Sequence, residues 1–151
     1  MATNYLSNKA KYLLATKALD LATDTLKLVL VLGTYTPDPD NNFLDSITAY
    51  ELDYAASGYI KGFGNAGRHA IASAAVTQVD ASNLAKFTFA TATWTALGPA
   101  TGGATIAYAL LAKEITDDAH SPIIATYDVG LTVNSGDVTL TPHANGAITI
   151  S

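Results

Sequence analysis

The chain has 151 residues, of which 49% are hydrophobic and only 14% charged, and its formal net charge is −5. This length predicts a single domain, residues 1–151, with a core of its own. The negative charge argues against a nucleic-acid-binding protein, which would need a basic patch. The lack of cysteine excludes disulfides, thiolate nucleophiles and cysteine zinc sites. No apolar run could span a bilayer, no signal peptide follows Met1, and so few charges indicate a surface partly covered by neighbours.

Residues 4–22 carry apolar side chains at helical spacing over about five turns. We therefore predict that residues 1–22 form an N-terminal helix or arm. Two interpretations remain open. The segment could cover the protein's own sheet, or it could dock on a partner through residues such as Leu6 and Leu13.

The first predicted strand is Thr23–Leu32, in which Leu26, Leu28, Leu30 and Leu32 fall on one face. Its other face begins polar and becomes apolar, as expected for a strand that enters the interior. The next segment, Tyr35–Asp45, is a predicted loop because it combines two prolines with several Asp and Asn residues.

This loop raises two questions. Asp38, Asp40 and Asn42 match the first three ligand positions of an EF-hand, but Phe43 and Ala49 replace the required glycine and glutamate, so we predict a solvated loop without a metal site. Apolar residues in such a loop either pin it to the core or mark a contact surface. The residues predicted to contact a partner on this basis, together with one from the following segment, are Tyr35, Pro37, Phe43, Leu44 and Tyr59.

Glu51–Phe63 resembles an irregular edge strand. Gly62–Gly67, GFGNAG, matches the dinucleotide pattern G-x-G-x-x-G, but no βαβ unit surrounds it, so a turn between strands is the better interpretation. Ala70–Val79 and Leu84–Thr91 are predicted to pair, with Phe87 and Phe89 on one face. Trp94 is predicted to fill the core with its indole N–H on a carbonyl; a sugar-binding platform is the alternative.

The central hairpin is predicted from two apolar runs, Ala104–Lys113 and Pro122–Val129, joined by the polar connector Glu114–Ser121. Its alternation places Ile106, Tyr108, Leu110 and Ala112 on one face, and on the second strand it groups Ile123 with Ala125, Tyr127 and Val129. We expect Leu110 and Ile123 deep in the core, and Asp117 and Asp118 exposed at the tip. Asp137–Thr141 and Ala147–Ser151 are predicted to form a terminal hairpin through the turn signal Asn145-Gly146.

The sequence thus predicts a mainly β protein, an antiparallel β-sandwich of about seven to eight strands with an N-terminal helical segment. His69, His120 and His143 are scattered, and no nucleophile motif is present. We therefore expect no catalytic residues, no metal and no cofactor, and a protein that is not an enzyme.

Four segments together carry a family resemblance, namely Asp24–Ile47 (DTLKLVLVLGTYTPDPDNNFLDSI), 56–63 (ASGYIKGF), 86–97 (KFTFATATWTAL) and 106–130 (IAYALLAKEITDDAHSPIIATYDVG). Their order resembles a family of small virion structural proteins of tailed bacteriophages, although the family's Gly-Tyr segment is richer in glycine. The resemblance covers nearly all of the chain, and its motifs are structural.

The resemblance implies a capsid decoration (cement) protein that binds the shell of the major capsid protein, as a homo-oligomer or bound to the lattice. It also implies a location in the virion, after assembly in the host cytoplasm. A tail, head–tail adaptor or fibre-associated protein is the first alternative. A carbohydrate-binding module is the second, with Trp94 and Tyr59 as the sugar contacts.

Overall fold

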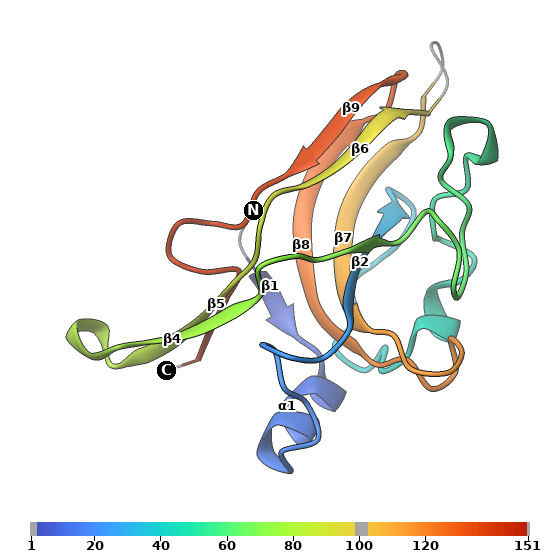
Figure 1. Cartoon of the computed structure of the whole chain (residues 1–151). Coiled ribbons are helices and arrows are strands. Elements are labelled where there is room, and N and C mark those ends of the chain that lie inside the picture. Colours follow the sequence, from blue (N-terminus) through green and yellow to red (C-terminus); the bar gives the residue numbers. More distant parts are fainter. Residues whose placement is uncertain (1–2, 99–102, 151) are drawn as a thin grey trace.

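The computed structural model describes residues 3–98 and 103–150, which form antiparallel sheets and one helix (Figure 1). A five-stranded sheet has the order β1-β8-β7-β2-β3, a three-stranded sheet the order β10-β5-β4, and a two-stranded ribbon pairs β6 with β9. This confirms a mainly β, antiparallel fold with a helix near the N-terminus. The strands are β1 (Thr3–Leu6), β2 (Leu26–Leu32), β3 (His69–Ala70), β4 (Ala75–Val79), β5 (Leu84–Thr88), β6 (Ala92–Leu97), β7 (Thr105–Lys113), β8 (Ile123–Thr132), β9 (Gly136–Leu140) and β10 (Ile148–Ile150); the helix is α1 (Asn8–Ala15), and single 3-10 turns span Leu44–Ile47, Ala55–Ser57 and Asp80–Ser82.

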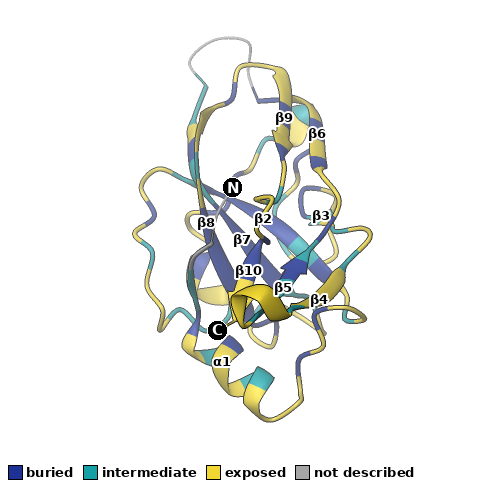
Figure 2. Ribbon diagram, turned by 90° about the vertical axis from the view of Figure 1, so that its left-hand side faces the viewer, coloured by how far each residue is buried: buried dark blue, intermediate teal, exposed yellow. Residues whose placement is uncertain are grey.

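The main core lies between the five-stranded sheet and the two smaller sheets. Leu26, Leu28 and Leu30 of β2 point into it, as their predicted alternation requires, and Phe87 and Phe89 meet them from the β5 side. Figure 2 shows β2 and β7 largely buried, whereas buried and exposed residues alternate along β6 and β9. Sheet-on-sheet packing of alternating side chains is the architecture of a β-sandwich.

A second, smaller core covers the opposite face of the large sheet. It holds Val29 and Val31 of β2 and Leu110 of β7, together with Leu44 and Ile47 from the 33–54 segment. The apolar residues of this long loop therefore pin it to the sheet, which was one of the two interpretations of its sequence. Because both faces of β2 are covered, nearly every residue in its LKLVLVL sequence is apolar.

The central hairpin is confirmed, but its predicted alternation is wrong at two places. Irregular pairing between Ile106 and Tyr108 and between Leu111 and Ala112 shifts the register. Ile106 therefore faces the main core while Leu110 faces the second. On β8, Ile123 lies in the second core and Ala125 in the main one. A bulge adds a residue and breaks the period-2 rule on which the prediction depended.

The N-terminal segment differs from the predicted five-turn helix. Thr3–Leu6 is an edge strand antiparallel to β8, and α1 spans only Asn8–Ala15. Ser7 ends the strand and caps the helix, because its Oγ accepts a hydrogen bond from the backbone N–H of Ala10. Lys17 then adopts a left-handed conformation with φ of 57°, which ends the helical geometry. The segment packs on the chain's own sheet, as the first interpretation held.

The predicted terminal hairpin is wrong. The segment from Gly136 to Leu140 pairs with β6, and Ile148–Ile150 pairs with β5, so the two strands belong to different sheets. The Asn145-Gly146 turn does form, with the Gly146 N–H donating to the His143 carbonyl, but it turns the chain from one sheet to another.

The predicted strand in Glu51–Phe63 is also wrong. This segment contributes only two isolated bridges, Val31 to Glu51 and Tyr54 to Tyr59. Ala70 pairs with β2 instead of starting the next strand. With β1, β3 and β6 added, the described residues contain ten strands where about seven to eight were predicted.

Candidate functional site

The densest group of charged side chains in the described residues surrounds Arg68. Its Nε donates to Glu51 Oε1 at 2.9 Å and its Nη2 to Glu51 Oε2 at 2.7 Å, a two-point contact. Both side chains are completely buried. Burial disfavours the guanidinium charge, but the hydrogen bonds that Arg68 donates to Glu51 and Asp118 more than compensate, so the pKa of Arg68 lies above its ordinary value.

Two further carboxylates complete what we call the Arg68 cluster: Arg68, Glu51, Glu114, Asp118 and Lys27. Arg68 Nη1 lies 2.6 Å from Asp118 Oδ1 and 3.5 Å from Glu114 Oε1, and Lys27 pairs with Glu114. The cluster therefore ties together β2, the 33–54 segment, the β7–β8 connector and the glycine-rich turn. This corrects the prediction for Asp118, whose carboxylate is mostly buried, while Asp117 is exposed as expected.

The glycine-rich turn supplies the remaining donors of this cluster. The Gly62 N–H donates to Glu51 Oε2 and the Gly64 N–H to Glu114 Oε1, both at 3.3 Å. Both glycines have positive φ, 96° and 70°, which side chains rarely adopt. These amides donate hydrogen bonds to the protein's own carboxylates. In a dinucleotide-binding loop they would donate to phosphate oxygens. The interpretation of GFGNAG as a turn between strands is confirmed.

Gly67, at the end of this turn, allows a close approach that a side chain would prevent. A Cβ at this position would lie 2.5 Å from the Tyr59 ring and 2.6 Å from the Ile60 carbonyl. The Gly67 carbonyl accepts a hydrogen bond from Trp94 Nε1 at 2.8 Å, and Trp94 is only 7% exposed. The prediction that Trp94 fills the core with its N–H on a carbonyl is confirmed, so its ring cannot serve as a sugar platform.

The predicted contact residues divide into two groups. Tyr35, Leu44 and Tyr59 are buried in the chain's own core, so their prediction as partner contacts does not fit the structure. Tyr59 is held there because its hydroxyl accepts a hydrogen bond from the Leu30 N–H at 2.9 Å. The other four are half-buried: Leu6 and Leu13 pack against the main core, Phe43 lies under the ammonium of Lys9, and Pro37 lines a surface hollow.

The acidic loop holds the helix. Asp40 Oδ1 accepts a hydrogen bond from Asn8 Nδ2 at 2.6 Å, and Asn42 Oδ1 accepts one from the Lys9 N–H at 3.1 Å. Asp38 Oδ1 accepts the Asp40 N–H. Within residues 3–98 and 103–150, no group of three or more His, Cys, Asp or Glu side chains could hold a metal ion. The three histidines lie apart, His69 against Trp94, His120 beside Asp117, and His143 in the 142–146 turn.

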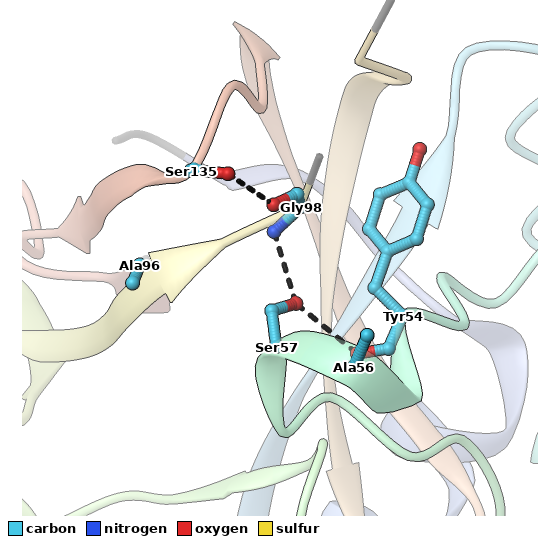
Figure 3. A pocket seen from close by; sticks show the side chains of 6 residues that line it. All are labelled: Tyr54, Ala56, Ser57, Ala96, Gly98 and Ser135. Atoms are coloured by element: carbon cyan, nitrogen blue, oxygen red, sulfur yellow. Dashed lines mark hydrogen bonds between the residues drawn. The ribbon is translucent and has the colours of Figure 1, made fainter. Parts of the chain in front are cut away.

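A surface hollow of about 480 Å³ lies between the Ala55–Ser57 turn and the end of β6 (Figure 3). Its two serine hydroxyls already have partners: Ser57 Oγ accepts the Gly98 N–H and donates to the Tyr54 carbonyl, and Ser135 Oγ donates to the Gly98 carbonyl. The Tyr54 hydroxyl accepts the Ala104 N–H. The described lining includes no histidine or carboxylate to activate a serine. The serines of this hollow therefore link neighbouring loops by hydrogen bonds.

Comparison of the chain with protein-family models, curated proteins and solved structures gave no match. In the described part of the chain, no helix is long and apolar enough to cross a membrane. Sequence reasoning missed Arg68 and Glu51 altogether. The available signal was that Arg68 is the chain's single arginine and follows a glycine-rich turn.

Proposed function

We propose that this protein is a structural component of a tailed-phage virion, a decoration (cement) protein that binds the shell of the major capsid protein. The observation that supports the proposal is that the clustered charged side chains have a structural role. The carboxylates and cations of the Arg68 cluster are bound to one another and to backbone amides, so they serve as a clamp and leave no free acid–base pair. The family resemblance supplies the virion context.

The surface supports a role in assembly. Several large apolar side chains are exposed, among them Tyr12 at 60%, Ile115 at 52% and Val76 at 50%. With only 14% charged residues, the chain has few surface charges to keep it apart from neighbours. A tail or adaptor protein would share these properties and differ in symmetry. The carbohydrate-binding alternative loses its two predicted contacts, because Trp94 and Tyr59 are both buried.

The test is the position and copy number of the protein in purified particles. Mass spectrometry of the particles should detect the chain in many copies, and electron cryomicroscopy should place it on the outer capsid surface. Rings of six or twelve copies at the tail axis would replace the decoration role with the adaptor role. Absence of the chain from particles would reject both.

A further inference from the structure

The three-stranded sheet ends at β4 in an edge without a neighbour. Its order is β10-β5-β4, so β4 pairs with β5 on one side and with no other described strand. Side chains of this sheet and of the five-stranded one share the main core, and in Figure 1 the β4–β5 hairpin extends to the lower left. Four of the five β4 residues are exposed. The smaller sheet is thus two strands narrower than the sheet that it faces.

Backbone geometry shows which peptide groups face outward. The Phe87 carbonyl accepts a hydrogen bond from the Ala147 N–H, so the polar groups of Phe87 point toward β10. Val76 lies opposite Phe87, and in an antiparallel ladder the polar groups of both members of such a pair point away from each other. The peptide groups of Val76 and Gln78 therefore face outward, and those of Thr77 face β5.

The edge lacks the features that usually protect an exposed strand. Its sequence, Ala-Val-Thr-Gln-Val, contains no charge and no proline, and its pairing with β5 runs without a bulge. Beside it lies a hollow of about 400 Å³ between the sheet and the 14–22 segment, lined mostly by apolar residues and by Lys17 and Asp20. The apolar residues lining this hollow include Leu14, Leu19, Leu21, Val76 and Ile150.

The strand is also complementary to itself. An antiparallel copy centred on Thr77 would place Val76 opposite Gln78 of the partner, where the outward-facing peptide groups of both strands meet. No charges oppose each other in that register. The nearest like charges on the same row are the two Lys86 side chains, which three strand spacings would separate by about 14 Å, beyond the screening length at physiological salt.

We propose that β4 pairs antiparallel with β4 of a second copy of this chain, making a continuous six-stranded sheet. Each partner strand would lie beside the hollow and cover Val76. A contact between two five-residue strands alone would bury a small area. Covering the hollow and Val76 adds apolar area to that contact. The inference names a self-association surface for the proposed structural role, but the pairing does not depend on the capsid.

Cysteine variants test the register, because the chain has no cysteine of its own. In the proposed pair Thr77 faces its own copy at a non-hydrogen-bonded position, where Cα atoms lie about 4.5 Å apart, within disulfide range. Oxidised Thr77→Cys should therefore run as a covalent dimer. Thr149→Cys, on the opposite edge of the same sheet, should form no covalent dimer under the same conditions. Crosslinking of Thr149→Cys but not of Thr77→Cys would overturn the proposal.

Light scattering during size-exclusion chromatography tests the edge itself. At about 100 μM, where a micromolar contact is populated, the wild-type mass should be twice 15.6 kDa. Gln78→Pro removes one outward N–H without disturbing the bonds to β5 and should give a monomer. Its melting temperature should match that of the wild type at concentrations too low for dimerisation. Gln78→Ala retains that N–H and should stay dimeric. A monomeric or polydisperse wild-type chain would overturn the proposed β4–β4 dimer. It would not affect the proposed capsid binding, which the analysis of purified particles tests.

Discussion

Arg68 shows how a single buried charge determines local structure. Its guanidinium holds Glu51 by two bonds and Asp118 by two more, from segments far apart in the chain. We predict that Arg68→Met lowers the free energy of unfolding by about 3–5 kcal/mol, because it leaves buried carboxylates without a cation. Urea denaturation monitored by Trp94 fluorescence measures this. A variant with an unchanged midpoint would mean that the cluster contributes nothing to stability.

The two neighbouring aspartates at the hairpin tip provide a matched pair. Asp118→Ala removes one of the two carboxylates that form close hydrogen bonds with Arg68, and should cost about 1–3 kcal/mol, the range for losing a partner of a buried charged group. Asp117→Ala changes an exposed carboxylate whose side-chain partner is His120, and should leave the denaturation midpoint close to that of the wild type. Equal effects of the two substitutions would contradict the assignment of Asp118 to the cluster.

Tyr5 makes stability depend on pH in the alkaline range. Burial raises the pKa of Tyr5 to about 12, from 10.0 for an ordinary tyrosine. Between these values the unfolded chain releases a proton that the folded chain retains, so the free energy of unfolding falls as pH rises. The stabilisation is complete below pH 10 and is lost toward pH 12. Tyr5→Phe should reduce the loss measured from melting temperatures at pH 9 to 11, whereas Tyr12→Phe, at an exposed ring, should not.

The structural environment of some single residues could be predicted from the sequence, and that of others could not. The environment of Trp94 was predictable, because a lone buried indole needs an acceptor for its N–H. The Arg68–Glu51 pair was not, because the two residues are separated by 17 positions of irregular loop, whose path follows no periodic pattern. For the same reason Tyr35, Leu44 and Tyr59 could not be distinguished from surface contacts. Apolar loop residues have the same composition in either role.

At the scale of elements, the central hairpin separates two cores. Leu110 is fully buried in the second core, and Leu110→Ala should lower the free energy of unfolding by about 2–5 kcal/mol, the usual range for a large-to-small core substitution. The same range applies to Ile123→Ala. Leu131→Ala, at a 36% exposed position of β8, is the matched control and should cost much less. If Leu110→Ala abolishes assembly without shifting the urea midpoint, the hairpin belongs to an interface.

The acidic loop and α1 act together as one element. Asp40 and Asn42 hold the first turn of the helix, so their oxygens already have partners. We predict that millimolar calcium leaves the melting temperature unchanged, because Phe43 replaces the glycine that an EF-hand loop requires for its turn and Ala49 replaces its bidentate glutamate. A rise of several degrees that Asp38→Ala with Asp40→Ala abolishes would show that the loop binds calcium.

Elements were predictable where the signal was local. The leucine alternation of β2, the β4–β5 pair and the central hairpin depend on periodicity and adjacent turns, and all three are present. The β6–β9 and β5–β10 pairs join strands that are distant in sequence. The Asn145-Gly146 signal correctly indicated a turn, but a turn does not determine which strands pair. Bulges in β7 and β8 likewise interrupt the alternation of inward and outward side chains, and no pattern in the sequence marks where they occur.

At the scale of the whole molecule, the first and last strands connect distant parts of the chain. β1 pairs with β8, more than a hundred residues away, and Ser7 joins them through hydrogen bonds to the carbonyls of Ile123 and Ile124. The 33–54 segment then closes over the other face of the same sheet. Such non-local pairing favours slow folding, because the entropy of loop closure is lost before the contacts form.

This arrangement predicts the effect of removing residues 1–15. Ala10 is buried, Leu6 and Leu13 pack against the main core, and β1 protects the edge of β8. Deletion should lower the free energy of unfolding by more than about 3 kcal/mol, from the apolar area re-exposed, and should promote aggregation through the freed edge of β8. Urea denaturation and light scattering measure the two effects. If the shortened chain keeps its midpoint but no longer joins particles, the segment is a docking arm, and its packing on β8 is not what stabilises the fold.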